Sequence, residues 1–350
     1  MKIDDLLNRT SEWLKATGPS SDIVISTRLR LARNIDKISF THWASKKQRE
    51  EVLSLVKSAT ESTNLLKNSL SIRMNDISEL DRQFLIERHL MSPEHAFQPE
   101  YKALVIEPRE IISVMVNEED HLRVQVIQSG FNLRDAWFLI DKLDTELNRV
   151  LEYAYSVTWG YLTACPTNTG TGMRSSLMLH LPALVMTHQI NKVLQAVTKV
   201  GAAVRGLYGE GTEAIGNFFQ ISNQVTLGRP EEDIIGNFEN IMNQVVSREA
   251  QARRYLMLRQ KEELTDKVAR AYATLKSARI ITSNETINLM SNIRLGVNLE
   301  MLPDVDIKTV NEIFIMVQPA DLQKLENKVL DHDQRDMKRA DLIRKKLKGQ

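Results

Sequence analysis

The stretch ALVIEPREIISVMVNEEDHLRVQVIQ, residues 103–128, decides the fold. It contains three runs rich in β-branched and apolar residues, at residues 103–106, 111–116 and 122–127. Only a few residues connect each run to the next. A parallel crossover needs a dozen residues or more, so these runs predict antiparallel strands.

The segments on either side mix strand and helix patterns without regular βαβ alternation. Further strands are predicted at residues 23–30, 174–181, 203–207 and 217–227. Helices are predicted at residues 1–18, 46–69, 77–91, 132–155 and 182–199. This arrangement indicates an α+β domain with a largely antiparallel sheet flanked by helices.

The pattern changes after Gly228-Arg229-Pro230, because almost every later segment has helical periodicity. Helices are predicted at residues 231–278, 284–292, 306–316 and 319–347. A chain of 350 residues fits two domains. We therefore predict a catalytic unit at residues 1–258 and an all-α C-terminal domain at residues 259–350.

Composition argues against several classes of function. The 46 basic and 45 acidic residues give no overall field that would favour nucleic acid or an anionic membrane. No apolar run approaches the ~18 residues of a membrane span, and no secretory signal is recognisable. The single cysteine, Cys165, excludes an internal disulfide. A cytoplasmic protein is expected.

The common nucleotide-binding loops are missing from the sequence, including the Walker A loop and the strand-linked Gly-rich loop. A cage of arginines is another way to hold phosphates, since guanidinium groups stay charged and fork onto two oxygens. Arg28 and Arg30 share one face of a predicted strand. The candidate set is Arg28, Arg30, Arg123, Arg174 and Arg205. Each arginine taken singly also fits an ordinary surface position.

Two acidic turns, residues 117–121 and 209–213, and a Gly/Thr-rich loop at residues 165–172 accompany these arginines. Carboxylates could orient a guanidinium acceptor and take its proton. Backbone N–H groups of the loop could form an anion-binding nest. Each feature also has a purely structural interpretation, as a solvated turn or a small buried cysteine.

The order of these motifs resembles the catalytic domain of the phosphagen (guanidino) kinases, the family of arginine and creatine kinases. The matching segments are residues 26–30, 117–123, 165–174 and 205–223. The resemblance implies a glutamine-synthetase-like catalytic fold and transfer of the γ-phosphoryl group of ATP to a guanidinium nitrogen. It also implies Mg²⁺ bound mainly through the nucleotide, without a protein metal site.

The resemblance implies roles for particular residues. Glu119 and Glu210 match the guanidinium-binding carboxylates, and Cys165 matches the cysteine that positions the guanidinium. The implied ATP-binding residues are Ser26, Arg28, Arg30, His89, Arg123, Arg174 and Arg205, with His89 lying against the adenine. Met178 stands where the small-molecule kinases have a second histidine.

Two departures from the small-molecule kinases concern the acceptor. Only 25 residues precede Ser26, where kinases of free arginine or creatine have a helical lobe that closes over the substrate. A helical extension also follows residue 258. Both features resemble the bacterial protein-arginine kinases, which implies arginine within proteins as the acceptor.

The same resemblance implies an allosteric phosphoarginine-binding site formed by Arg335, Asp336, Arg339 and Ala340. Arg335 and Arg339 are four residues apart, so on one helical face they could grip one phosphate together. A basic C-terminal helix also complements its own dipole without binding a ligand.

The implied partners are protein substrates with exposed arginine, a zinc-binding activator, a Clp-type unfoldase or protease, and a heat-shock repressor. The implied context is stress response and protein quality control. Two rival functions stay open: a kinase of free arginine or another small guanidino compound, and a non-catalytic adaptor that reads phosphoarginine. Homo-oligomerisation through the C-terminal domain and the identity of the modified arginines also stay open.

Overall fold

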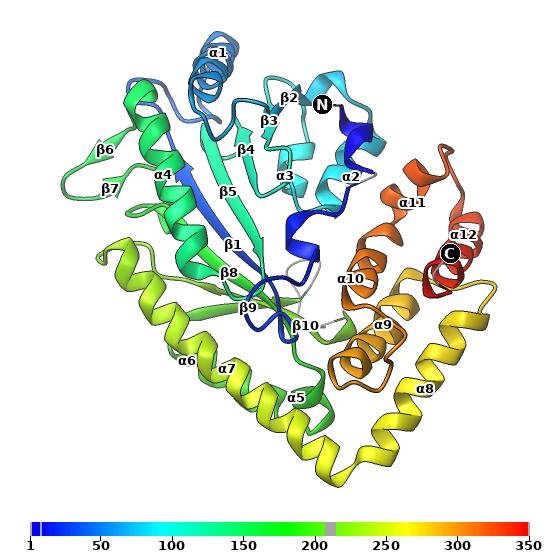
Figure 1. Cartoon of the computed structure of the whole chain (residues 1–350). Coiled ribbons are helices and arrows are strands. Elements are labelled where there is room, and N and C mark those ends of the chain that lie inside the picture. The colour runs from blue at the N-terminus through cyan, green and yellow to red at the C-terminus, as the bar shows by residue number, and fades with distance from the viewer. Residues whose placement is uncertain (1, 8, 207–214, 349–350) are drawn as a thin grey trace.

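An eight-stranded sheet forms the centre of the molecule (Figure 1). The computed structural model describes residues 2–7, 9–206 and 215–348. Every strand pair in this sheet is antiparallel, in the order β2-β3-β4-β5-β1-β8-β10-β9. The strands are β1 (Val24–Arg33), β2 (Leu70–Arg73), β3 (Ala103–Ile106), β4 (Ile112–Val116), β5 (Leu122–Ser129), β8 (Met173–His180), β9 (Ala202–Gly206) and β10 (Phe218–Asn223). The predicted fold class is confirmed.

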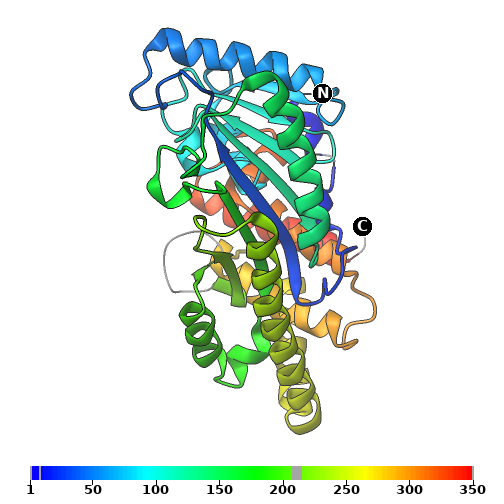
Figure 2. The same cartoon turned by 90° about the vertical axis from the view of Figure 1, so that its left-hand side faces the viewer.

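Helices α1 (Lys46–Ser62), α4 (Leu133–Leu151) and α7 (Glu231–Arg259) cover one face of the sheet, and α6 (Ile190–Lys199) packs on β9 beside them. Figure 2 shows α4 lying along the strands, with α7 below it. Alternate residues of the central strands, such as Leu29 and Leu31 of β1, are fully buried in this core. Because side chains alternate along a strand, the residues between them point to the other face.

The N-terminal segment and the C-terminal helices cover part of the opposite face. Trp13, Ile25, Ile127 and Phe314 belong to one buried cluster there. The C-terminal helices are α8 (Lys261–Ser277), α9 (Ser283–Asn298), α10 (Ile307–Met316), α11 (Pro319–Leu325) and α12 (His332–Leu347). The other α-helices of the described residues are α2 (Glu79–Glu87), α3 (Pro93–Ala96) and α5 (Pro182–Met186), and β6 (Tyr155–Ser156) and β7 (Gly160–Tyr161) form a separate hairpin.

The predicted helix at residues 1–18 is wrong. The described part of this segment forms two 3-10 turns, Ile3–Leu6 and Glu12–Leu14. Leu6 and Trp13 are buried in different clusters, so the segment spreads its apolar side chains over two sites and does not bury a single helical face.

Other predicted helices are shorter or divided. The helix expected at residues 182–199 is two helices, with His188 at a φ of 58° between them. The long helix expected at residues 231–278 breaks at Gln260, between α7 and α8. The domain boundary near residue 258 stays a prediction, and α7 packs on the sheet and reaches that point without a linker.

Candidate active site

The five predicted phosphate-binding arginines share the sheet face that points away from α4. In β1, Arg30 lies opposite Arg174 of β8. Residues directly opposite each other in antiparallel strands point to the same face. Arg123 of β5 lies opposite Ala32, two residues from Arg30. Arg205 of β9 lies opposite Gln220 of β10, which in turn faces Met178 of β8. The strand register therefore places residues of five strands, β1, β5, β8, β9 and β10, on one shared face of the sheet.

The charges on this face repel one another. Burial and the neighbouring Arg123 lower the pKa of Arg28 to about 9. Burial, Arg123 and Arg28 together lower the pKa of Arg30 well below its ordinary value. Arg30 Nε is also buried without a hydrogen-bond partner among the described residues. A bound polyanion would neutralise these charges and supply acceptors for their donors.

Polar neighbours fix the orientation of two of these arginines. Arg28 Nε donates to Gln125 Oε1 at 2.6 Å, and Gln125 Nε2 donates to the backbone carbonyl of His89 at 2.8 Å. Arg174 Nη2 donates to Ser222 Oγ at 3.1 Å. The sequence patterns did not predict Gln125. Its only signal is its spacing of two residues from Arg123, on the same face of β5.

Three residues of the acidic turn at residues 117–121 hold the turn in place. Asn117 adopts a left-handed φ of 59°. Asp120 accepts hydrogen bonds from Asn34 Nδ2 and from the backbone N–H of Ala164, both at 2.7 Å. His121 Nδ1 accepts a backbone N–H at 3.0 Å. Asp120 thus fixes the residue that precedes Cys165.

Glu118 of this turn pairs with a predicted phosphate ligand. Its oxygens lie 2.6 and 2.7 Å from Arg123 Nη1. Burial opposes ionisation of Glu118, but the charge and hydrogen bonds of Arg123 bring its pKa below the ordinary value. The sequence patterns did not predict this pair, which holds Arg123 in place on the arginine face.

Glu119 and Cys165, both predicted catalytic residues, are brought together. Glu119 and Cys165 lie close enough for the Cys165 side chain to act against the rise in the pKa of Glu119. Partial burial and the charges of Asp120 and Glu118 raise the pKa of Glu119, which favours its acting as a proton acceptor. Glu119 is exposed and Cys165 is partly exposed. The second predicted carboxylate, Glu210, lies outside the described residues.

The loop at residues 165–172 is anchored from two sides. Thr226 Oγ1 donates to the carbonyls of Thr167 at 2.8 Å and Thr169 at 2.9 Å. Arg33 Nη1 donates to the carbonyl of Thr171 at 2.8 Å. These bonds fix the backbone that carries Cys165, and the anion-binding role of the loop stays a prediction.

A pocket adjoins the arginine face. Its lining includes Ser26, Arg28 and His89, all three predicted to bind ATP, together with Met178. Burial and Arg28 lower the pKa of His89 to about 4, so its ring is neutral at neutral pH. The ring of His89 meets that of Trp13 edge-on at 5.3 Å. A neutral ring between apolar walls suits a flat nucleobase.

The predicted phosphoarginine residues lie on α12. Arg339 is buried, its Nε donates to the carbonyl of Val317 at 2.9 Å, and its Nη1 bonds both the carbonyl of Ile281 and Asp336. Arg335 Nη1 donates to the carbonyl of Leu330 at 3.0 Å. Ala340 is buried beside them. These contacts tie α12 to neighbouring helices, and the phosphoarginine role stays a prediction.

The described residues contain neither a candidate metal cluster nor a candidate membrane-spanning helix. In that part of the chain, no group of three or more His, Cys, Asp or Glu side chains is placed to hold a metal ion. None of the described helices combines the length and the apolar character that crossing a membrane requires.

Comparison with known proteins identifies the family. Residues 51–252 match the C-terminal catalytic domain of the ATP:guanido phosphotransferases, and residues 261–350 match the C-terminal domain of the protein-arginine kinase McsB. A protein-arginine kinase of Halothermothrix orenii is 46% identical over 348 residues, covering 99% of each chain. The chain belongs to the protein-arginine kinase family. Another protein-arginine kinase, from Desulforamulus reducens, is 48% identical over 97% of this chain and 96% of its own.

A solved structure shows the same fold. The substrate-free duplicated taurocyamine kinase from Schistosoma mansoni is 24% identical, with a TM-score of 0.60 over 73% of this chain. The match covers 40% of that kinase, so the chain spans about two fifths of its length. Membership of the protein-arginine kinase family confirms the predicted resemblance and the phosphotransferase class.

Proposed function

We propose that this protein-arginine kinase family member transfers the γ-phosphoryl group of ATP to a guanidinium nitrogen of arginine residues in other proteins. The observation that carries the proposal is the set of arginines on one sheet face beside the Glu119–Cys165 contact. The names of the curated relatives support the same acceptor.

The proposed reaction is an in-line displacement at the γ-phosphorus. The triphosphate lies on the arginine face and the base enters the pocket beside His89. A guanidinium nitrogen forms the P–N bond, the bond from the γ-phosphorus to the bridging oxygen breaks, and ADP leaves. The acceptor nitrogen loses a proton to Glu119, and Glu210 is proposed as the second orienting carboxylate. Catalysis rests on positioning and on charge stabilisation by the arginines.

Mg²⁺ would accompany ATP and neutralise charge on the phosphate oxygens. Both oxygens of Glu118 are already bonded to Arg123, so this carboxylate does not offer a free ligand. We therefore propose that the ion is held mainly by the nucleotide.

Exposure of the acceptor side supports a protein substrate. Glu119 is exposed and Cys165 is partly exposed, so an arginine on the surface of another protein can reach them. We propose cytoplasmic action that marks proteins for Clp-type proteolysis and modulates a heat-shock repressor, with a zinc-binding activator as a further partner. The resemblance to the protein-arginine kinases supports this cellular role.

The decisive experiment compares two acceptors under MgATP. A denatured protein and free arginine are incubated separately with the full chain, and products are followed by phosphorus NMR and by mass spectrometry under non-acidic conditions. We expect phosphoarginine in the protein. Phosphoramidate formed only on free arginine would indicate a small-molecule kinase. Phosphoarginine binding without any ATP turnover would indicate the adaptor function.

Replacing the proposed base tests the role of Glu119. Glu119→Gln keeps the shape of the side chain but removes the proton acceptor, so we expect kcat to fall about 10²- to 10⁴-fold. ADP affinity, measured by calorimetry, should change little. Glu61→Gln, an exposed carboxylate on α1, is the control. Normal turnover by Glu119→Gln would contradict the assignment.

A further inference from the structure

The pocket beside the arginine face is not built by the sheet alone. Helix α10 of the C-terminal region contributes Asn311, Phe314 and Ile315 to its lining. The N-terminal segment contributes Trp13 and Leu14. The rest of the lining comes mainly from the strands, among them Ser26, Arg28 and Phe218, together with His89. A helix far along the chain from the strands therefore forms one wall.

An aromatic stack fixes this wall against the sheet. Phe314 meets Phe218 of β10 edge-on, with ring centroids 4.9 Å apart. Phe218 in turn stacks on His180 of β8 at 4.8 Å, and the two residues are direct partners in the strand register. The position of Phe314 is thus set by rings that belong to the catalytic sheet.

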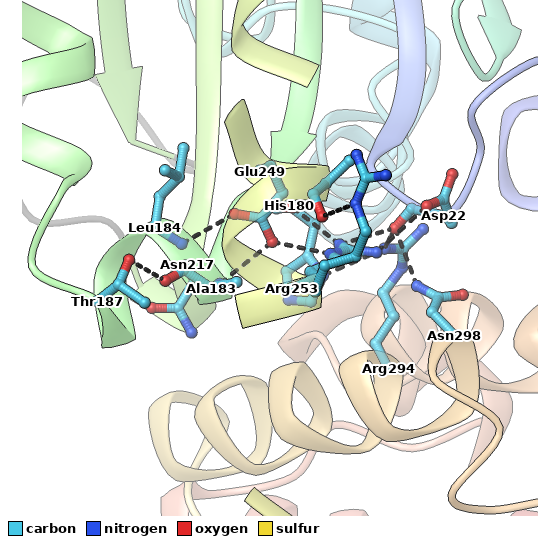
Figure 3. Close-up of polar contacts among 12 residues, drawn as sticks. Asp22, His180, Ala183, Leu184, Thr187, Asn217, Glu249, Arg253, Arg294 and Asn298 are labelled. Atoms are coloured by element: carbon cyan, nitrogen blue, oxygen red, sulfur yellow. Dashed lines mark hydrogen bonds and ion pairs between the residues drawn. The ribbon is translucent and has the colours of Figure 1, made fainter. Parts of the chain in front are cut away.

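A polar network fixes the same wall from the other side. Arg294 of α9 donates to the carbonyls of Ser21 at 2.5 Å and Asp22 at 2.7 Å, and its Nη1 lies 3.2 Å from His180 Nδ1. Figure 3 shows Arg294, Asp22 and His180 converging at this junction. Asp22 lies two residues before β1, the strand that carries Ser26 and Arg28.

Asn311 connects this network to the pocket. Its Oδ1 accepts a hydrogen bond from Arg294 Nε at 3.2 Å, and its Nδ2 donates to the carbonyl of Leu14 at 3.1 Å. Asn311 and Leu14 both line the pocket. Helix α10 is therefore held by hydrogen bonds both to Arg294 and to the N-terminal segment, so this wall of the pocket is fixed in place.

The chemistry of this pocket suits a nucleobase better than a phosphate. Its walls are mostly apolar or aromatic, and the ring of His89 is neutral at neutral pH. Trp13, only 4% exposed, keeps Nε1 buried without a hydrogen-bond partner among the described residues. A purine offers a flat apolar face and ring nitrogens that accept hydrogen bonds.

We propose that the C-terminal domain is part of the nucleotide site, with α10 forming the wall that binds the base. The inference rests on the proposed function, because it assigns the phosphates to the arginine face. Phosphate binding depends on the sheet, whereas base binding depends on the docked C-terminal helices. Reciprocally, a nucleotide that fills the pocket stabilises the docking of α10, since the two equilibria are linked.

The test separates the base from the phosphates by comparing ADP with inorganic tripolyphosphate. Calorimetry on the full chain measures both ligands with the unmodified protein, with Phe314→Ala and with Phe314→Leu. Phe138→Ala, a ring 71% exposed on α4, is the matched control. We expect Phe314→Ala to weaken ADP binding about tenfold and to leave tripolyphosphate binding within twofold. Phe314→Leu retains most of the buried volume and should show a smaller loss of the same kind.

Hydrogen exchange on the unmodified protein provides a test without mutation. ADP should slow exchange of the amides of residues 307–316, and tripolyphosphate should not. ADP affinity unchanged in both Phe314 variants, an equal loss of both ligands, or no protection of α10 by ADP would overturn the inference. Equal affinity of the unmodified protein for tripolyphosphate and for ADP would also overturn the inference, because the base would then add no affinity. The proposed phosphate site would be unaffected by that result. Binding of neither ligand would refute the proposed function itself.

Discussion

Strand β1 carries a buried arginine on one face and half-buried arginines on the other, and they differ in their partners. On the helix-covered face, Arg33 pairs with Asp144 of α4 at 2.7 Å and lies 3.5 Å from the centre of the Tyr161 ring. Burial opposes its charge, but Asp144 raises its pKa above the ordinary value. On the other face, the pKa of Arg30 is lowered by burial and by neighbouring arginines. An arginine that is paired with a buried carboxylate, such as Arg33, has a structural role. An arginine that lies among other cations, such as Arg30, is suited to bind an anion.

A lowered pKa alone does not make this distinction. Burial and Arg253 lower the pKa of Arg294 to about 9, close to that of Arg28. The donors of Arg294 nevertheless reach two carbonyls and the side chain of Asn311. A lowered pKa is therefore read together with the hydrogen-bond partners of the arginine, because the partners of Arg294 account for its place in the fold.

The largest expected effect comes from removing a cation on the arginine face. Arg30→Ala should lower kcat/KM for phosphoryl transfer at least about 10³-fold, because charge on the transferring group loses a fixed partner. The melting temperature without nucleotide should stay the same or rise, since repulsion with Arg28 and Arg123 is relieved. Steady-state kinetics and thermal unfolding measure the two effects. Arg109→Ala, an exposed arginine, is the control.

Replacing the arginine on the helix-covered face of β1 should destabilise the fold. Arg33→Ala leaves Asp144 buried and unpaired, so the free energy of unfolding should fall by about 3–5 kcal/mol. Urea unfolding of the protein without nucleotide measures this loss. Arg134 lies on α4, the helix that carries Asp144. Arg134→Ala removes a surface ion pair with Glu239 and should lower the free energy of unfolding by about 1 kcal/mol or less. Equal losses for Arg33→Ala and Arg134→Ala would remove the distinction between the two faces.

Local patterns predicted the parts of the site that depend on one segment. The shared face of Arg28 and Arg30 follows from strand periodicity, and the antiparallel pairing of residues 103–127 follows from short connections. The placing of Arg123, Arg174 and Arg205 on the same face depends on register between distant strands. No spacing within the sequence specifies that register, so the resemblance to a family was needed to group them.

The missed residues also depend on tertiary contacts. Gln125 matters because β5 lies beside β1, and Glu118 matters because its turn folds back onto Arg123. Trp13 lines the pocket from a short 3-10 turn, which stands in place of the predicted N-terminal helix. On α12, helical spacing placed Arg335 and Arg339 on one face, but only the packed structure shows that Arg339 bonds the carbonyl of Val317 at the end of α10.

Arg123 lies between the two classes, because it belongs to the arginine face and yet has a carboxylate partner. The folded-state pKa of Glu118 lies below its ordinary value of 4.5, so its pairing stabilises the fold above about pH 4.5. Glu118→Gln should therefore lower the free energy of unfolding by about 1–3 kcal/mol at neutral pH. As the pH falls through the lowered pKa, Glu118 becomes protonated and the difference between the two proteins should disappear. Urea unfolding between pH 3 and pH 7 measures this, with Glu50→Gln from the exposed Arg73 pair as the control. A difference that grew as the pH fell would show that Glu118 does not stabilise the fold as a carboxylate, and Arg123 would then belong with Arg28 and Arg30.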